Sequence, residues 1–167
     1  MEKKFVLAVY VDNKAGVLTR VSAMFTRRGF NIEAITSGET DIPEYSRITI
    51  TMNGDEYVKE QLINQLKKLH VVKKVMVLDD DPIMRELMLI KVHNKVKDRS
   101  DIMTAVDVFR ANVIDYSPEA MCIEVTGSPS KMDAFIKLMQ PFGILEMCRT
   151  GIVALDRGEI TLLNKEK

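Results

Sequence analysis

Two asparagines and a glycine near the N terminus have the chemistry of a small binding site. Asn13 and Gly16 follow an apolar run of strand length, and Asn31 lies just beyond the helical pattern that begins at Val17. The backbone N–H groups after Gly16 would be the free donors of a helix start, and such donors hold a carboxylate or a phosphate. Each asparagine adds an amide donor and a carbonyl acceptor. These residues predict a pocket for a small anion, in particular an amino acid.

The same residues also fit an ordinary connection between a strand and a helix. Asn and Gly are common turn formers, so Gly16 could serve backbone geometry alone. Asn31 could likewise be a plain connector after Gly29, which is expected to end the helix. From these residues alone, ligand binding and a plain turn are equally well supported.

Residues 1–78 contain the element order strand, helix, strand, strand, helix, strand. Apolar residues alternate strictly in the third strand, and they recur at helical spacing in both helices. This order is the ferredoxin-like βαββαβ unit, an α+β fold with two helices on one face of an antiparallel sheet. The expected strands are residues 5–11, 31–39, 46–52 and 71–78, and the expected helices are residues 17–28 and 55–69.

The same element order returns after an acidic segment that ends in Pro82. This segment, residues 79–84, is predicted to be a linker between two domains, residues 1–78 and 85–167. The two halves share their element order but no evident sequence identity. Each sheet has only two helices, so its other face needs a cover from the other half or another subunit. The expected strands are residues 86–92, 112–116, 121–126 and 144–148, and the helices begin near residues 100 and 129.

The composition excludes several classes of protein. Acidic and basic residues are equal in number and the net charge is zero, whereas a nucleic-acid surface normally has a basic excess. The apolar run after Lys4 is too short for a signal peptide, and no stretch reaches the roughly 18 apolar residues of a membrane span. We therefore expect a cytoplasmic protein without nucleic-acid or membrane partners. Cys122 and Cys148 lie in strands separated by another strand and should be free thiols.

No arrangement of residues predicts catalysis by this chain. His70 and His93 are isolated, and no Cys/His cluster has metal-ligand spacing. A phosphate-binding loop and a nucleophile elbow are also missing from the sequence. The sequence therefore predicts a protein that is not an enzyme by itself and binds no metal.

Short motifs throughout residues 4–158 resemble the small, regulatory subunit of acetolactate synthase, also called acetohydroxyacid synthase. The first half carries the pattern of that family's ACT domain, and the second half narrows the resemblance to this family. Two departures are the linker at Asp81-Pro82 and the pair Met121-Cys122. The matching stretches are Asn13-x-x-Gly16-Val17-Leu18, Phe25-x-x-Arg28-Gly29-Phe30-Asn31-Ile32, Ser46-Arg47-Ile48, Glu86-Leu87-Met88, Phe109-Arg110-Ala111-Asn112 and Arg149-Thr150-Gly151.

The resemblance implies a non-catalytic partner of an enzyme of branched-chain amino-acid biosynthesis. Such a subunit activates the large catalytic subunit and makes it sensitive to feedback inhibition by valine. The cofactors, thiamine diphosphate, magnesium and FAD, are expected on the catalytic subunit and not on this chain. The first domain is expected to be an ACT domain, which forms a homodimer.

The valine site implied by the resemblance lies between the two ACT domains of the dimer. Asn13, Gly16 and Val17 of one subunit would meet the carboxylate and ammonium groups of valine. Asn31 and Ile32 of the other subunit would close the pocket, with Val17 or Ile32 against the isopropyl group. Two other interpretations stay open: a free-standing ACT sensor that regulates another protein, and a small enzyme on a ferredoxin-like fold.

Overall fold

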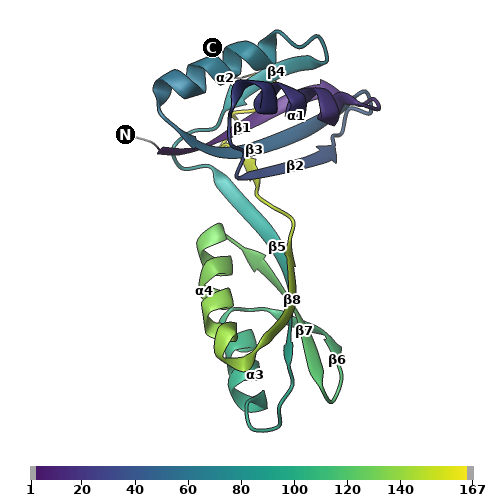
Figure 1. Ribbon diagram of the computed structural model, residues 1–167, viewed down its shortest axis with the longest axis vertical. Coiled ribbons are helices and arrows are strands. Elements are labelled where there is room, and N and C mark those ends of the chain that lie inside the picture. Colours follow the sequence, from purple (N-terminus) through teal and green to yellow (C-terminus); the bar gives the residue numbers. More distant parts are fainter. Residues whose placement is uncertain (1–2, 165–167) are drawn as a thin grey trace. The chain divides into compact units, whose positions relative to one another are not determined.

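The computed structural model describes residues 3–164, which contain both predicted βαββαβ units (Figure 1). Every predicted helix and strand is present, which confirms the α+β fold with two tandem ferredoxin-like units. The first unit contains β1 (Lys3–Asp12), α1 (Val17–Arg28), β2 (Ala34–Glu39), β3 (Tyr45–Gly54), α2 (Glu56–Lys67) and β4 (Val72–Val77). The second contains β5 (Ile83–His93), α3 (Arg99–Val108), β6 (Asn112–Tyr116), β7 (Ala120–Gly127), α4 (Pro129–Met139) and β8 (Ile144–Arg149).

Four strands of each sheet have the same topology. In the first sheet the strand order is β2-β3-β1-β4, and in the second it is β6-β7-β5-β8, with β9 (Val153–Leu155) paired to β5 as a fifth strand. In both sheets the first strand of the unit pairs antiparallel with its neighbours on either side. The register even shifts at matching places, between Tyr10 and Val11 in β1 and between Lys91 and Val92 in β5. The repeat therefore extends to details of strand pairing.

Each unit has its own hydrophobic core between one face of its sheet and its two helices. In the first core, alternate residues of β1 and β3 meet α1 and α2, because side chains alternate between the faces of a strand. In the second, alternate residues of β5 and β7 meet α3 and α4. The largest fully buried side chains are Phe25 and Phe135, one in each core.

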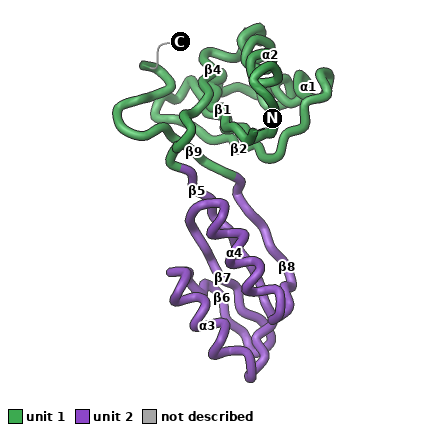
Figure 2. Tube along the Cα trace, turned by 90° about the vertical axis from the view of Figure 1, so that its left-hand side faces the viewer, with its two compact units in different colours: residues 1–83, 152–167 green, residues 84–151 purple. Residues whose placement is uncertain are grey.

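The division by contacts differs from the predicted boundaries at the C-terminal end of the chain. The first unit consists of the residues up to Ile83 together with those from Ile152 onward, and the second consists of residues 84–151 (Figure 2). The tail that was expected to belong to the second domain thus packs with the first. It includes β9 (Val153–Leu155) and buries Ile152, Ala154 and Leu162.

The segment after α1 also differs from the prediction. A strand was expected from Asn31, but β2 begins at Ala34. Gly29 ends the helix in a left-handed conformation, and the N–H of Phe30 donates to the carbonyl of Phe25 at 3.1 Å. This is the hydrogen bond of a Schellman cap, and it turns the chain before sheet pairing can begin. Pairing with β3 starts only where Ala34 lies opposite Thr51.

Candidate functional site

Asn13 joins the turn after β1 to the loop between β2 and β3. Its backbone N–H donates to the carbonyl of Glu44 at 2.8 Å, and its Nδ2 donates to the carbonyl of Pro43 at 3.1 Å. Its Oδ1 accepts from Ser46 Oγ at 3.0 Å. The side chain therefore holds the two connections together. The second hydrogen of its amide and the second lone pair of its oxygen are still available for another hydrogen bond. Pro43 and Ser46, which hold this asparagine, were not among the predicted site residues.

The β2–β3 loop that receives Asn13 is itself held in one conformation. Thr40 Oγ1 accepts from the N–H of Ile42 at 3.1 Å and lies 3.0 Å from the carbonyl of Tyr45. The N–H of Tyr45 donates to the carbonyl of Ile42 at 2.9 Å. The β2–β3 loop therefore offers Asn13 hydrogen-bond acceptors at fixed positions. The position of the β1–α1 turn depends on this loop as well as on its own residues.

Gly16 occupies the N-cap position of α1 with a left-handed φ of 80°. No atom lies within 4 Å of the position that a Cβ would take, so backbone conformation and not crowding favours glycine. Neither α1 nor α3 has a side-chain cap, whereas Asp55 caps α2 and Ser128 caps α4. The first turn of α3 contains Asp101, but the first turn of α1 has no acidic residue. An uncapped helix start leaves backbone donors available for an anion.

The residues after Gly16 point in different directions. Val17, predicted to contact the ligand, is only 5% exposed and belongs to the hydrophobic core, and its N–H donates to the carbonyl of Lys14 at 3.4 Å. Leu18 is 47% exposed at the same helix start. The sequence signal for Leu18 was its position beside the buried stripe of Val17 and Val21. Leu18 is therefore an apolar surface residue of the candidate site that the prediction did not include.

Asn31 and Ile32 lie beyond the opposite end of α1. Asn31 is exposed, while Ile32 is half-buried and packs against the core. The helix between the two groups has 12 residues. At 1.5 Å per residue this helix separates Gly16 from Asn31 by about 18 Å. A single chain therefore brings Asn13, Gly16 and Val17 into one turn and does not join them to Asn31 and Ile32.

Charge near the turn is partly neutralised by an ion pair. Asp12, which directly precedes Asn13, pairs with Lys73 Nζ at 3.0 Å, and its side chain is only 18% exposed. A neighbouring carboxylate would otherwise oppose an anionic ligand at this helix start. On the helix itself, Arg20 Nη1 lies 2.9 Å from Nε2 of His70. The surroundings of the turn thus suit a carboxylate better than a cation.

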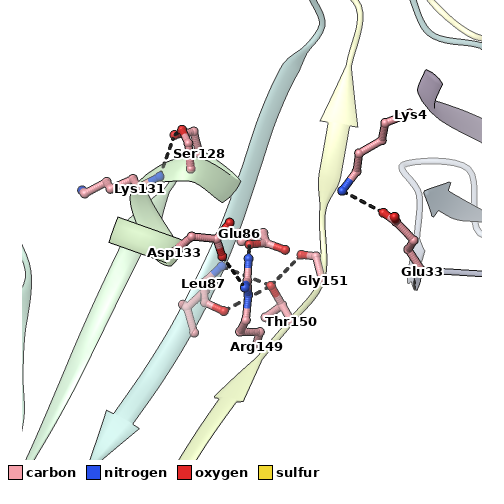
Figure 3. A network of polar contacts seen from close by, with 11 residues as sticks. Lys4, Glu33, Glu86, Leu87, Ser128, Lys131, Asp133, Arg149, Thr150 and Gly151 are labelled. Carbon is pink, nitrogen blue, oxygen red and sulfur yellow. Dashed lines mark hydrogen bonds and ion pairs between the residues drawn. The ribbon is translucent and has the colours of Figure 1, made fainter. Parts of the chain in front are cut away.

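The second unit contains a polar cluster of a different kind (Figure 3). Arg149 of β8 pairs with the buried Glu86 of β5, and its Nη1 lies 2.9 Å from Asp133 Oδ1 of α4. Burial lowers the pKa of Arg149, but the hydrogen bonds and charges of Glu86 and Asp133 outweigh this effect and raise it. Leu87 N–H also donates to Thr150 Oγ1 at 3.1 Å. These contacts tie two strands and a helix together.

Membrane spans and metal sites have no candidate among the described residues. Across residues 3–164, no helix combines the length and apolar character needed to cross a membrane. Within the same residues, no three His, Cys, Asp or Glu side chains gather in a way that could hold a metal ion.

Both halves of the chain match models of one protein family. Residues 7–74 match an AHAS small subunit-like ACT domain, and residues 85–158 match the model described as small subunit of acetolactate synthase. The first match confirms that the first unit is an ACT domain.

Individual relatives match over almost the whole chain. A probable acetolactate synthase small subunit from Archaeoglobus fulgidus is 47% identical over 155 residues, which cover 93% of this chain and 98% of that protein. An acetolactate synthase small subunit from Mycobacterium bovis is 45% identical over 157 residues, covering 93% of this chain and 94% of that protein. The crystal structure of the acetolactate synthase small subunit from Thermotoga maritima aligns with a TM-score of 0.90 at 40% identity, covering 95% of this chain and 99% of that one. The chain therefore belongs to the acetolactate synthase small-subunit family.

Proposed function

We propose that this chain is the regulatory subunit of acetolactate synthase in valine, leucine and isoleucine biosynthesis. In this proposal it binds the large catalytic subunit, raises its activity and makes it sensitive to feedback inhibition by valine. The observation that carries the proposal is the uncapped start of α1 beside the braced turn at Asn13, within a domain that matches the ACT domain of this family.

Valine would bind through its carboxylate at the start of α1. The N–H groups of Leu18 and Thr19 would donate to this carboxylate, since the positive end of the helix dipole favours an anion, while the N–H of Val17 already donates to the carbonyl of Lys14. The remaining lone pair of Asn13 Oδ1 would accept from the ammonium group. Leu18 offers exposed apolar surface beside these groups and is an additional candidate for contact with the isopropyl group.

A second copy of the chain would complete this pocket. Asn31 and Ile32 lie about 18 Å from Gly16 along α1 of the same chain, so these two residues would have to come from another subunit. β2 lies at the edge of its sheet, where another subunit could make such a contact. We therefore propose a homodimer formed through the ACT domains, with valine held between Asn13, Gly16 and Val17 of one copy and Asn31 and Ile32 of the other.

Inhibition requires that valine bind one arrangement of the subunits better than another. A ligand held between two subunits meets this requirement because its occupancy favours one dimer geometry. In the proposal the chain has no catalytic activity of its own. Thiamine diphosphate, magnesium and FAD would be bound by the catalytic subunit, and the two proteins would work together in the cytoplasm.

The test is reconstitution with the large catalytic subunit of the same organism. Acetolactate formation is measured with the catalytic subunit alone, with this chain added, and with both proteins plus valine. We expect addition of the chain to raise the rate and valine to reverse this increase. If the chain binds valine but does not change the rate, it is a free-standing amino-acid sensor of another protein, and the proposed function is wrong.

A further inference from the structure

The face of the first sheet that lies opposite α1 and α2 is buried. Val6 and Ala8 alternate along β1 with the core residues, and they are 7% and 0% exposed. Thr49 and Thr51 of β3 and Met76 of β4 lie on the same face, because the strand register places them opposite these residues. All five are buried although both helices of the unit pack on the other face. Residues outside α1 and α2 therefore cover this face.

The C-terminal tail has the features of this cover. Ile152, Ala154 and Leu162 are 4%, 5% and 1% exposed, and they belong to the first unit but not to its helix-side core. The other two residues of β9, Val153 and Leu155, are exposed, which is the alternation of a strand with one face buried. We call residues 152–163 the strap. In Figure 2, β9 has the colour of the first unit.

Two basic side chains fasten the strap to the sheet. Arg47 Nη2 of β3 donates to the carbonyl of Ala154 at 2.7 Å, and Lys74 Nζ of β4 donates to the carbonyl of Leu163 at 2.8 Å. Both residues lie opposite Tyr10 of β1, so the two fasteners and Tyr10 form one row across the sheet. A third contact joins Asp156 Oδ1 to the N–H of Asp79 at 2.8 Å.

Each fastener is the immediate neighbour of a residue that holds the β1–α1 turn. Arg47 follows Ser46, whose hydroxyl donates to Asn13 Oδ1 at 3.0 Å. Lys74 follows Lys73, whose ammonium group pairs with Asp12 at 3.0 Å. The strap and the turn are therefore held by adjacent side chains of the same two strand segments, with Ser46 and Arg47 on opposite faces of the sheet and Lys73 and Lys74 at the register shift of β4.

From this juxtaposition we infer that docking of the strap and occupancy of the β1–α1 turn are coupled, with Arg47 as the positioning residue that links them. The inference rests on the proposed function and adds a route of regulation to it. A ligand that fixes Asn13 and Ser46 also fixes the backbone of β3 from which Arg47 reaches the strap. By linkage, the strap must then favour the ligand by the same factor. Since residue 152 follows β8 closely in the chain, the strap gives ligand occupancy a covalent connection to the second unit.

The experiment measures hydrogen exchange of the strap amides and valine affinity in the full-length chain. Calorimetry gives the affinity, and exchange of residues 152–163 is followed by mass spectrometry with and without valine. We expect valine to slow exchange of the strap by about fivefold or more, within the usual range of coupling between sites. Arg47→Met, which keeps the aliphatic stem, should speed exchange of the strap without ligand and weaken valine binding by a similar factor.

The matched control is Arg110→Met. Arg110 is exposed in the connection between α3 and β6 of the second unit. This variant should leave both strap exchange and valine affinity unchanged. Lys74→Met tests the second fastener and should loosen the strap near Leu163, which keeps the inference testable if Arg47→Met does not fold.

The outcomes separate this inference from the proposed function. If valine binds the wild-type chain but strap exchange does not respond, the coupling is wrong while the proposed ligand stands. The same conclusion holds if Arg47→Met loosens the strap and binds valine with unchanged affinity. If the wild-type chain binds no valine by calorimetry, the proposed ligand fails and the coupling fails with it.

Discussion

The first turn of each unit is braced by an asparagine in the same way. Asn13 follows β1 and Asn94 follows β5, and each donates its backbone N–H to the loop between the next two strands, at Glu44 and Glu119. Each also donates its Nδ2 to a carbonyl of that loop, at 3.1 Å in the first unit and 2.6 Å in the second. An asparagine at this position is therefore a structural brace of the fold in both units, whether or not a ligand binds there.

The two turns differ in the residues that come after the asparagine. Asn94 is 2% exposed, and its Oδ1 accepts from Arg99 Nε at 2.9 Å. Arg99 also lies over the ring of Tyr116, 5.5 Å from its centroid. The first residue of α3 therefore contacts the asparagine that holds the turn. In the first unit Asn13 stays exposed, and the helix start at Gly16 has no acidic residue, whereas the first turn of α3 contains Asp101. This difference supports the proposed ligand site at the first turn and not at the second.

The largest effect is expected from Gly16→Asp. A carboxylate at the start of α1 would take the place proposed for the carboxylate of valine and repel it. We expect calorimetry to show valine affinity reduced by about a hundredfold, which corresponds to about 2.7 kcal/mol.

Gly16→Asn is the matched control for this variant. Asparagine has almost the size of aspartate and would take the same left-handed φ of 80°, but it has no negative charge. It therefore shares the backbone strain of Gly16→Asp without the repulsion. The control should lose much less valine affinity than Gly16→Asp. Equal losses in both variants would show that strain, and not the charge at Gly16, causes the effect.

The next effect is expected on the stability of the second unit. Asn94→Ala removes the donor to Ser117 and the acceptor for Arg99 inside a buried turn. We expect a loss of about 2–3 kcal/mol, because a buried carbonyl is left without its donor. Urea denaturation followed by circular dichroism measures this loss, and a change below that of Asn13→Ala would contradict the ranking.

Asn13→Ala should cost less, because this asparagine is exposed and water can replace its partners. We expect about 1 kcal/mol in the free energy of unfolding. Valine affinity should fall less than in Gly16→Asp, since the helix-start donors remain in place. A loss of affinity larger than that of Gly16→Asp would move the ligand contact from the glycine turn to the asparagine.

The smallest effect is expected from Ser46→Ala. This change removes one hydrogen bond to Asn13 Oδ1 while the bonds from Asn13 to Pro43 and Glu44 remain. Stability should change by about 0.5 kcal/mol. A loss as large as that of Asn13→Ala in the same urea experiment would show that the hydrogen bond to the oxygen of Asn13, and not the one from its amide, supplies the stabilisation.

The order of elements and both cores could be predicted because they depend on local patterns. Alternation in β3 and helical spacing in α1 each record which face of an element is buried. Gly29 ended α1 as predicted because its left-handed conformation is a local property of the chain. The helical spacing of apolar residues in α1 also placed Val17 in the core, where the structure has it. For the side chain of Val17, this periodic pattern indicated burial, whereas the family resemblance implied contact with a ligand.

Long-range contacts were the part that the sequence did not reveal. The tail from Ile152 resembles any short apolar strand, and its place on the first sheet depends on Arg47 and Lys74, about a hundred residues earlier in the chain. The match between Asn13 and Asn94 was also missed, since the turns after them differ in sequence. Both features depend on which loops and strands meet in space, and local periodicity does not carry that information.

The most direct test of this account is an NMR titration of the 15N-labelled chain with valine. The account predicts that the largest shifts in the first turn occur at the amides of Gly16, Leu18 and Thr19. The amides of Arg99 and Ser100, at the matching helix start of the second unit, should not move. If calorimetry shows valine binding while the amides after Gly16 stay unchanged, the glycine turn is not the ligand site.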